Sequence, residues 1–112
     1  MAMLSIRMRA EPVRTLAAAS IGAAYMGVGT AISNPARMIL IQNLTDESVM
    51  FSLNGIDDHF PLPATGLFIL DITSNVAIAQ GFFLAQGDRL YVKQLGVPTT
   101  GSVYFTVFYG SE

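Results

Sequence analysis

The side chains best suited to chemistry lie together in residues 52–59, where a serine, an asparagine, two aspartates and a histidine occur within one short segment. His59 is the only histidine of the chain, so any histidine-dependent acid–base mechanism, or a Ser-His-Asp arrangement with Ser52, depends on it alone. No Gly-x-Ser-x-Gly nucleophile elbow surrounds Ser52. A calcium site needs about six to eight oxygen ligands, and Asp57 and Asp58 supply too few. The segment is therefore interpreted as an exposed turn in which His59 makes local hydrogen bonds.

The rest of the chain offers no alternative site. It has no cysteine, which excludes a disulfide scaffold and, together with the single histidine, the usual zinc spacings. The Gly-Val-Gly of residues 27–29 lacks the third glycine and the βαβ context of a dinucleotide fingerprint. Aromatic residues at 104–109 have no basic residues between them, as base stacking would require. We therefore expect a protein that is not an enzyme, binds no cofactor or metal, and contacts no nucleic acid.

Positive charge is concentrated at the start of the chain. Residues 1–14 contain three basic residues, Arg7, Arg9 and Arg14, and one acidic residue, Glu11, whereas the remainder of the chain has a net negative charge. Three arginines are fewer than the run of about five to eight that indicates a nucleic-acid patch. The segment is either a solvated polar leader or an arm that docks on an acidic surface. We predict an extended arm at residues 1–14 that reaches an adjacent subunit, followed by one domain at residues 15–112.

Residues 15–36 carry no charge, as a signal peptide or a membrane anchor would require. Three glycines and several hydroxyl side chains make them a poor hydrocarbon segment, and Glu11-Pro12 interrupts the basic leader. The sequence therefore predicts no membrane contact.

Charge is unusually scarce over the whole chain. Only 12% of the 112 residues are charged and 52% are hydrophobic, whereas an average soluble domain carries about 25% charged residues. A small domain buries a lesser share of its surface, and large exposed apolar patches usually mark interaction sites. These proportions predict a domain that other chains cover.

Turn residues divide the chain into short runs of β-branched and aromatic residues, which is typical of a β-sandwich or barrel. The Asn-Gly at 54–55 favours a two-residue hairpin, and Pro61 and Pro63 exclude a central strand and indicate a rigid loop. Residues 15–26 are rich in alanine, but Gly22 within them and Gly27 and Gly29 just after them favour strand and turn over a long helix. We predict strands at Ala36–Gln42, Ser48–Leu53, Leu67–Thr73, Arg89–Leu95 and Ser102–Tyr109, with weaker candidates at Val13–Ala19 and Tyr25–Ile32.

Three of these strands, those at 36–42, 67–73 and 102–109, are apolar on both faces. A strand with one solvated face should alternate between apolar and polar residues, and the chain has no helices to cover a second face. The second face is therefore expected to meet another chain, or the N-terminal segment folded back across it. The side chains predicted to form this interface, besides those of the arm, are Met38, Leu40, Phe68, Leu70, Tyr104 and Phe108.

Turn and strand segments between Pro12 and Gly110 resemble a group of small structural proteins of tailed-bacteriophage virions. The resemblance implies a β-sandwich, no cofactor and many copies in a symmetric particle, and its segments carry no catalytic content. It is carried by Val13-Arg14-Thr15-Leu16, Gly29-Thr30-Ala31, Asn34-Pro35-Ala36-Arg37, Gln42-Asn43-Leu44-Thr45-Asp46, Ser52 to His59, Leu62-Pro63-Ala64, Asp71 to Asn75, and the closing segment from Gly101-Ser102-Val103-Tyr104 through Tyr109-Gly110.

The sequence thus predicts an all-β protein with a single antiparallel, jelly-roll-like β-sandwich and an N-terminal arm. We expect a capsid cement or decoration protein that bridges neighbouring capsid subunits. Its partners would be the major capsid protein or other virion proteins, together with copies of itself in a homo-oligomer, and it would be located in the virion assembled in the host cytoplasm. A head–tail connector or tail component is one alternative, and a carbohydrate- or receptor-binding β-sandwich module is another.

Overall fold

The computed structural model describes residues 7–71 and 86–111, and within them the regular secondary structure is β-strand apart from one turn of 3-10 helix. The predicted all-β class is confirmed, and each predicted strand has a counterpart, the last two residues of Leu67–Thr73 lying outside the described residues. The stretch at 15–26 forms a strand followed by a single turn of 3-10 helix, Ala18–Ser20, as expected from its glycines. The strands are β1 Arg7–Ala10, β2 Arg14–Ala17, β3 Met26–Gly27, β4 Met38–Asn43, β5 Val49–Ser52, β6 Phe60–Leu62, β7 Leu67–Asp71, β8 Tyr91–Gln94 and β9 Ser102–Ser111.

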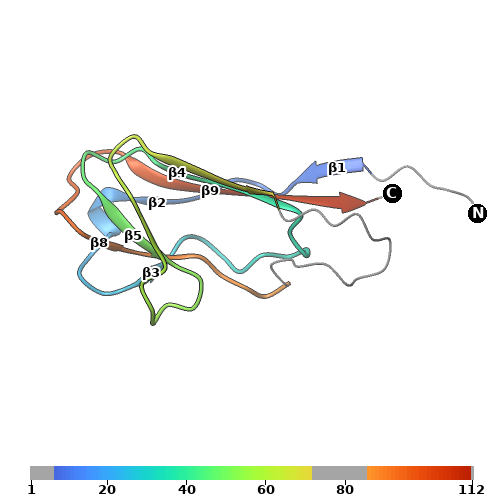
Figure 1. Cartoon of the computed structure of the whole chain (residues 1–112), viewed down its shortest axis with the longest axis horizontal. Coiled ribbons are helices and arrows are strands. Elements are labelled where there is room, and N and C mark those ends of the chain that lie inside the picture. Colours follow the sequence, from blue (N-terminus) through green and yellow to red (C-terminus); the bar gives the residue numbers. More distant parts are fainter. Residues whose placement is uncertain (1–6, 72–85, 112) are drawn as a thin grey trace, which may run out of the picture.

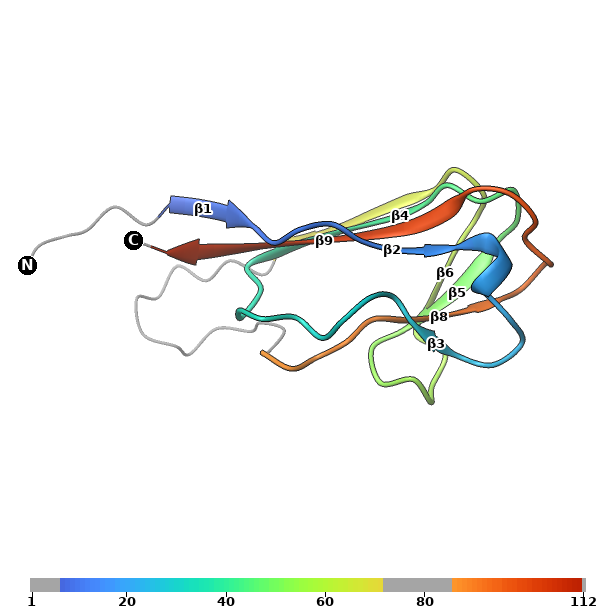
Figure 2. The same ribbon diagram turned by 180° about the vertical axis from the view of Figure 1, so that it is seen from behind.

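The strands form two antiparallel sheets that pack as a β-sandwich (Figure 1). The first sheet has the order β1-β9-β4-β7, with β2 also paired to β9, and the second has the order β3-β8-β5-β6. Both views show β1 and the end of β9 extending past the second sheet (Figures 1 and 2). The sandwich is confirmed, and the jelly-roll connectivity stays a prediction.

Strands β1 and β2 occupy the same edge of β9 in succession. Ala10 lies opposite Phe108 and Arg14 opposite Phe105, so three residues, 11–13, stand opposite two on β9. One extra residue of this kind produces a β-bulge and bends the strand, and Pro12, which has no N–H to donate, lies within it. The described part of the predicted arm is therefore an edge strand of the protein's own sheet, and residues 1–6 of the arm lie outside the described residues.

The core fills the space between the two sheets. Because β-strand side chains alternate, Ile39 and Ile41 of β4 share the inner face with Phe105 of β9, and all three are buried. They meet Phe51 of β5 and Val92 of β8, which are also buried. On β5, Val49 and Phe51 are both buried, whereas Leu53, just after the strand, is 40% exposed. The remaining core members are Ile21, Val28, Ile32, Ala36, Val49, Leu62, Leu90, Val103 and Val107.

A buried asparagine ties the sheets together at one end. Asn43 is inaccessible to solvent, and its Nδ2 donates to the carbonyl oxygens of Leu62 and Pro63 at 3.1 and 3.0 Å. Its Oδ1 accepts from the backbone N–H and the hydroxyl of Thr45 at 3.0 and 2.6 Å. The end of β4 is therefore held to the β6 segment by bonds that a buried amide must make.

Two local predictions were wrong in detail. The Asn54-Gly55 pair does not make a two-residue turn, because β5 ends at Ser52 and β6 begins at Phe60, which leaves a longer loop between them. Pro61 lies in a strand and not in a loop, although β6 is an edge strand, where a missing N–H is tolerated. The exclusion of a central strand at this position was correct.

Candidate interaction face

The register of the first sheet defines its outer face, the surface that points away from the core. Residues directly opposite on neighbouring strands share a face. The partly buried residues of β4 alternate with the inward-pointing Ile39 and Ile41, so these residues and those opposite them on the neighbouring strands lie on the outer face. The resulting rows across the sheet are Ala10–Phe108–Met38–Asp71, then Thr106–Leu40–Ile69, then Thr15–Tyr104–Gln42–Leu67, with Met8 opposite Gly110 beyond the first row.

This outer face is apolar and nearly uncharged. Met8, Leu67 and Ile69 are 60%, 57% and 58% exposed, which is unusual for side chains of this size in the middle or at the edge of a sheet. Among the described residues of these rows, Asp71 is the only charged one, and it occupies a corner. Single exposed apolar side chains are normal, but a contiguous apolar surface marks a site of interaction.

The structure brings four of the predicted interface residues together on this face. Met38, Leu40, Tyr104 and Phe108 are partly buried neighbours on the central strands β4 and β9. Their position agrees with the expected second face of these strands, and what they contact in an assembly stays a prediction.

The placement of Phe68 and Leu70 on the same surface is corrected. Phe68 lies opposite the buried Ile41, and its ring packs against that of Phe60 of β6 in a tilted arrangement with 4.8 Å between ring centroids, so it belongs to the inner face. Leu70, two residues further, points the same way. Because β7 is apolar on both faces, its sequence does not distinguish them, and the residues on the outer face are instead Leu67 and Ile69.

The predicted role of Arg14 as an arm residue is also corrected. Arg14 is buried, with 9% of the residue exposed, and it forms an ion pair of 2.8 Å with Glu11, which is 6% exposed. Residues three apart on a regular strand point to opposite faces, but the extra residue between β1 and β2 brings both side chains to the inner side. Buried in this way, Arg14 does not reach a neighbouring subunit.

The Glu11–Arg14 pair fastens the loop before β4 to the edge strand. Arg14 donates to the carbonyl oxygens of Thr30 and Ala31 at 2.8 and 2.9 Å, and Glu11 accepts from the Asn34 amide at 2.8 Å. Burial raises the pKa of Glu11. The hydrogen bonds from Asn34, Arg14 and the backbone of Ser33 together lower it by more than burial raises it, so the net pKa lies below its ordinary value of 4.5.

Gly29 allows the loop to approach this pair closely. It has a φ of +70°, and a Cβ there would lie 2.8 Å from the Cβ of Arg14. Other predicted arm residues are on β1: Arg7 lies opposite Ser111 in the ladder, and the exposed Arg9 lies opposite Tyr109.

The outer face of the second sheet differs because the chain covers it with its own loop. The loop between β5 and β6 folds back so that Gly55 lies on the Tyr91 ring, and a Cβ at Gly55 would come within 3.3 Å of it. Asp58 accepts a 2.5 Å hydrogen bond from the Tyr25 hydroxyl and pairs with Lys93 at 2.9 Å. This face is therefore polar and occupied, whereas the outer face of the first sheet is bare in the described chain.

The cluster at 52–59 is held by turn chemistry. Asn54 Oδ1 accepts from the backbone N–H groups of Ile56 and Asp57 at 2.8 and 2.9 Å, which is an Asx-type turn. The Ser52 hydroxyl donates to the same oxygen at 2.9 Å, and His59 Nδ1 accepts from the Leu53 N–H at 2.9 Å. These local bonds match the predicted exposed turn, and the described residues contain no group of three or more metal-ligating side chains.

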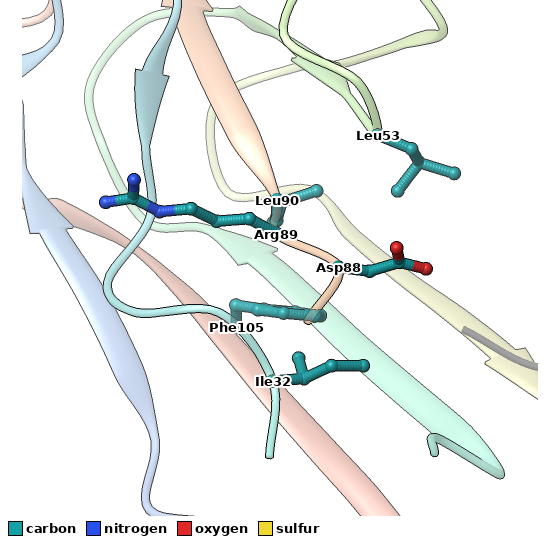
Figure 3. Close-up of a pocket in the computed structure, with 6 residues that line it drawn as sticks. All are labelled: Ile32, Leu53, Asp88, Arg89, Leu90 and Phe105. Atoms are coloured by element: carbon teal, nitrogen blue, oxygen red, sulfur yellow. The ribbon is translucent and has the colours of Figure 1, made fainter. Parts of the chain in front are cut away.

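Two hollows lined by described residues are respectively too small and too open to enclose a ligand. Figure 3 shows one beside Phe105 and Ile32, with Arg89 and Asp88 directing their charged ends to opposite sides. Its volume of about 10 Å³ accommodates at most one water molecule. A shallow groove along residues 10–15 is larger, but it lies open beside the Glu11–Arg14 pair.

Within residues 7–71 and 86–111, no helix is long and apolar enough to span a membrane. Comparison of the chain with protein-family models, curated proteins and solved structures finds no match.

Proposed function

We propose that this protein is a non-enzymatic structural component of a bacteriophage virion, a cement or decoration protein that bridges neighbouring capsid subunits. The observation that carries the proposal is the outer face of the first sheet, which is apolar, nearly uncharged and uncovered by any described segment. The virion itself is proposed from the sequence resemblance.

The contrast between the two outer faces supports docking through the first sheet. The 53–59 loop of the same chain covers the outer face of the second sheet through hydrogen bonds, whereas Leu40 and Ile69 face outward on the first sheet. A partner that binds only in the assembled particle stabilises that particle by mass action. The protein would thus act by burying apolar surface across a subunit junction.

Substitution on the two faces tests the proposal. In virions whose genome encodes Leu40→Glu, we expect at least a tenfold loss of retained protein, measured by quantitative mass spectrometry of gradient-purified particles. An uncompensated charge in a closed interface costs several kcal/mol, and about 1.4 kcal/mol corresponds to tenfold in affinity.

Met50→Glu is the matched control. Met50 is also partly buried on a central strand, β5, but it lies on the outer face of the second sheet opposite Lys93. We expect its retention to equal that of the wild type. Equal retention of both variants, or absence of the protein from purified virions, would contradict the proposal. The same measurement gives the copy number, which is hundreds for a cement protein and about 6–12 for a neck ring with cyclic symmetry.

A further inference from the structure

The four sheet edges of this protein differ in how well they are protected against pairing with another chain. Exposed edges are usually blocked by short strands, prolines, charges or bulges. The β3 edge is two residues long, and β6 contains Pro61. The β1 and β2 edge is interrupted by the extra residue at 11–13 and carries Arg9. Strand β7, Leu67–Asp71, has no proline, glycine or bulge, its single charge, Asp71, stands at the end of the strand, and among the described strands only β4 pairs with it.

The ladder shows which backbone groups of β7 point away from β4. Asn43 N–H donates to Gly66 O at 2.9 Å, which makes this a hydrogen-bonded pair. In an antiparallel ladder such pairs occur at every second residue, so Phe68 and Leu70 bond to β4. The N–H and C=O groups of Leu67 and Ile69 therefore point outward, away from β4.

The side chains of β7 suit pairing with a second copy of the same strand. An antiparallel pair centred on Ile69 is the register that pairs all five residues, and it places Ile69 opposite Ile69 and Phe68 opposite Leu70. Asp71 then faces Leu67 and not another Asp71, so no like charges are opposed. Leu70, which is 38% exposed within one chain, would be covered by the partner's Phe68.

We propose that two copies of this protein associate through their β7 strands, in a two-fold antiparallel pair centred on Ile69. The two first sheets become one continuous sheet, and the two apolar outer faces become one larger surface. The pairing uses the edge of the sheet and is independent of the docking face, so either proposal can fail without the other.

Single cysteines in the otherwise cysteine-free chain test the pairing. In the purified protein, Ile69→Cys places two thiols on a hydrogen-bonded pair whose Cα atoms lie about 5.5 Å apart, within the range of a disulfide. Leu67→Cys is the matched control, because Leu67 and Ile69 lie on the same face of β7 and are 57% and 58% exposed. Two copies of residue 67 would be offset by four residues, or about 13 Å along the strand, which is too far for a bond.

Under mild oxidation we expect Ile69→Cys to form disulfide dimers at least tenfold faster than Leu67→Cys. Amide exchange of the unmodified protein gives an independent measurement: the Ile69 N–H should become protected as protein concentration rises, while the Phe68 N–H is protected at every concentration. Equal cross-linking of both variants, absence of cross-linking in both, or a dimer that leaves the Ile69 N–H exchanging freely would overturn the proposal.

Discussion

Removing the Glu11 carboxylate should destabilise this protein more than any change of similar size on its surface. Glu11→Ala deletes the acceptor of the 2.8 Å bonds from Arg14 and Asn34 and of the Ser33 N–H at 3.1 Å. It leaves the Arg14 guanidinium 9% exposed without a counter-charge, while its Nη1 already has no hydrogen-bond partner. Breaking a buried ion pair by removing one partner costs about 3–5 kcal/mol, a large share of the roughly 5–15 kcal/mol that holds a domain folded.

Urea unfolding followed by circular dichroism measures this loss, and a double-mutant cycle with Arg14→Met measures the coupling. The double variant removes both charges, so we expect it to be more stable than the sum of the two single losses predicts, by at least about 1 kcal/mol. Val13→Ala, in the same strand break but 56% exposed, is the control and should change the free energy of unfolding by less than about 0.5 kcal/mol. If Glu11→Ala lowers the free energy of unfolding by less than about 1 kcal/mol, or if the two single losses are strictly additive, the Glu11–Arg14 ion pair does not hold the 28–34 loop in place and the reasoning is refuted.

The same carboxylate contributes to acid sensitivity. Because the pKa of Glu11 is lowered in the folded state from its ordinary value of 4.5, its stabilisation is present above that value and is lost as the pH falls through the folded pKa. Glu11→Gln should therefore flatten the acid limb of a stability–pH curve. An acid limb as steep as that of the wild type would show that other carboxylates determine it.

Three further predictions concern the scaffold. Burial and the hydrogen bond to Asp58 raise the pKa of Tyr25 to about 12. The stabilisation that the protonated Tyr25 hydroxyl contributes is therefore fully present below about pH 10 and is lost as the pH rises toward 12. Ultraviolet titration should show one tyrosine that ionises later than the others, and Tyr25→Phe should remove it. Asn43→Ala should cost about 2–3 kcal/mol in urea unfolding, because buried donors and acceptors lose their partner, and a loss under 1 kcal/mol would contradict the role of this amide. Gly101 has a φ of +83°, and a Cβ there would lie 2.0 Å from Leu44 O; Gly101→Ala should therefore lower the thermal midpoint, whereas Gly22→Ala, with open space around it, should not.

The positions of the strands could be predicted from sequence because they depend on local patterns. Turn residues and β-branched runs located β4, β5, β8 and β9 to within a few residues, and the glycines after residue 21 correctly opposed a long helix. The length of the loop after Ser52 could not be predicted from Asn54-Gly55, because Asn54 bonds to backbone groups further along and opens the turn.

The faces of the strands depend on long-range pairing, which a local pattern does not contain. Leu67 and Ile69 were missed because β7 is apolar on both sides, and its facing depends on its pairing with the distant strand β4, which begins with the bond from Asn43 N–H to Gly66 O. Arg14 was assigned to the arm because its charge suggested exposure, whereas the extra residue at the Pro12 break turns it inward beside Glu11. The spacing of Glu11 and Arg14 around a proline was the signal that could have indicated a bulge with both side chains on one side.

The most direct test of the central claim is an electron cryomicroscopy map of an intact virion that contains this protein. We predict that the outer face of the first sheet, from Met38 and Leu40 to Phe108, is covered by another protein chain, while the 53–59 loop on the opposite sheet is not required for the contact. A map in which Leu40 and Phe108 face open solvent on a fully occupied particle would contradict the account.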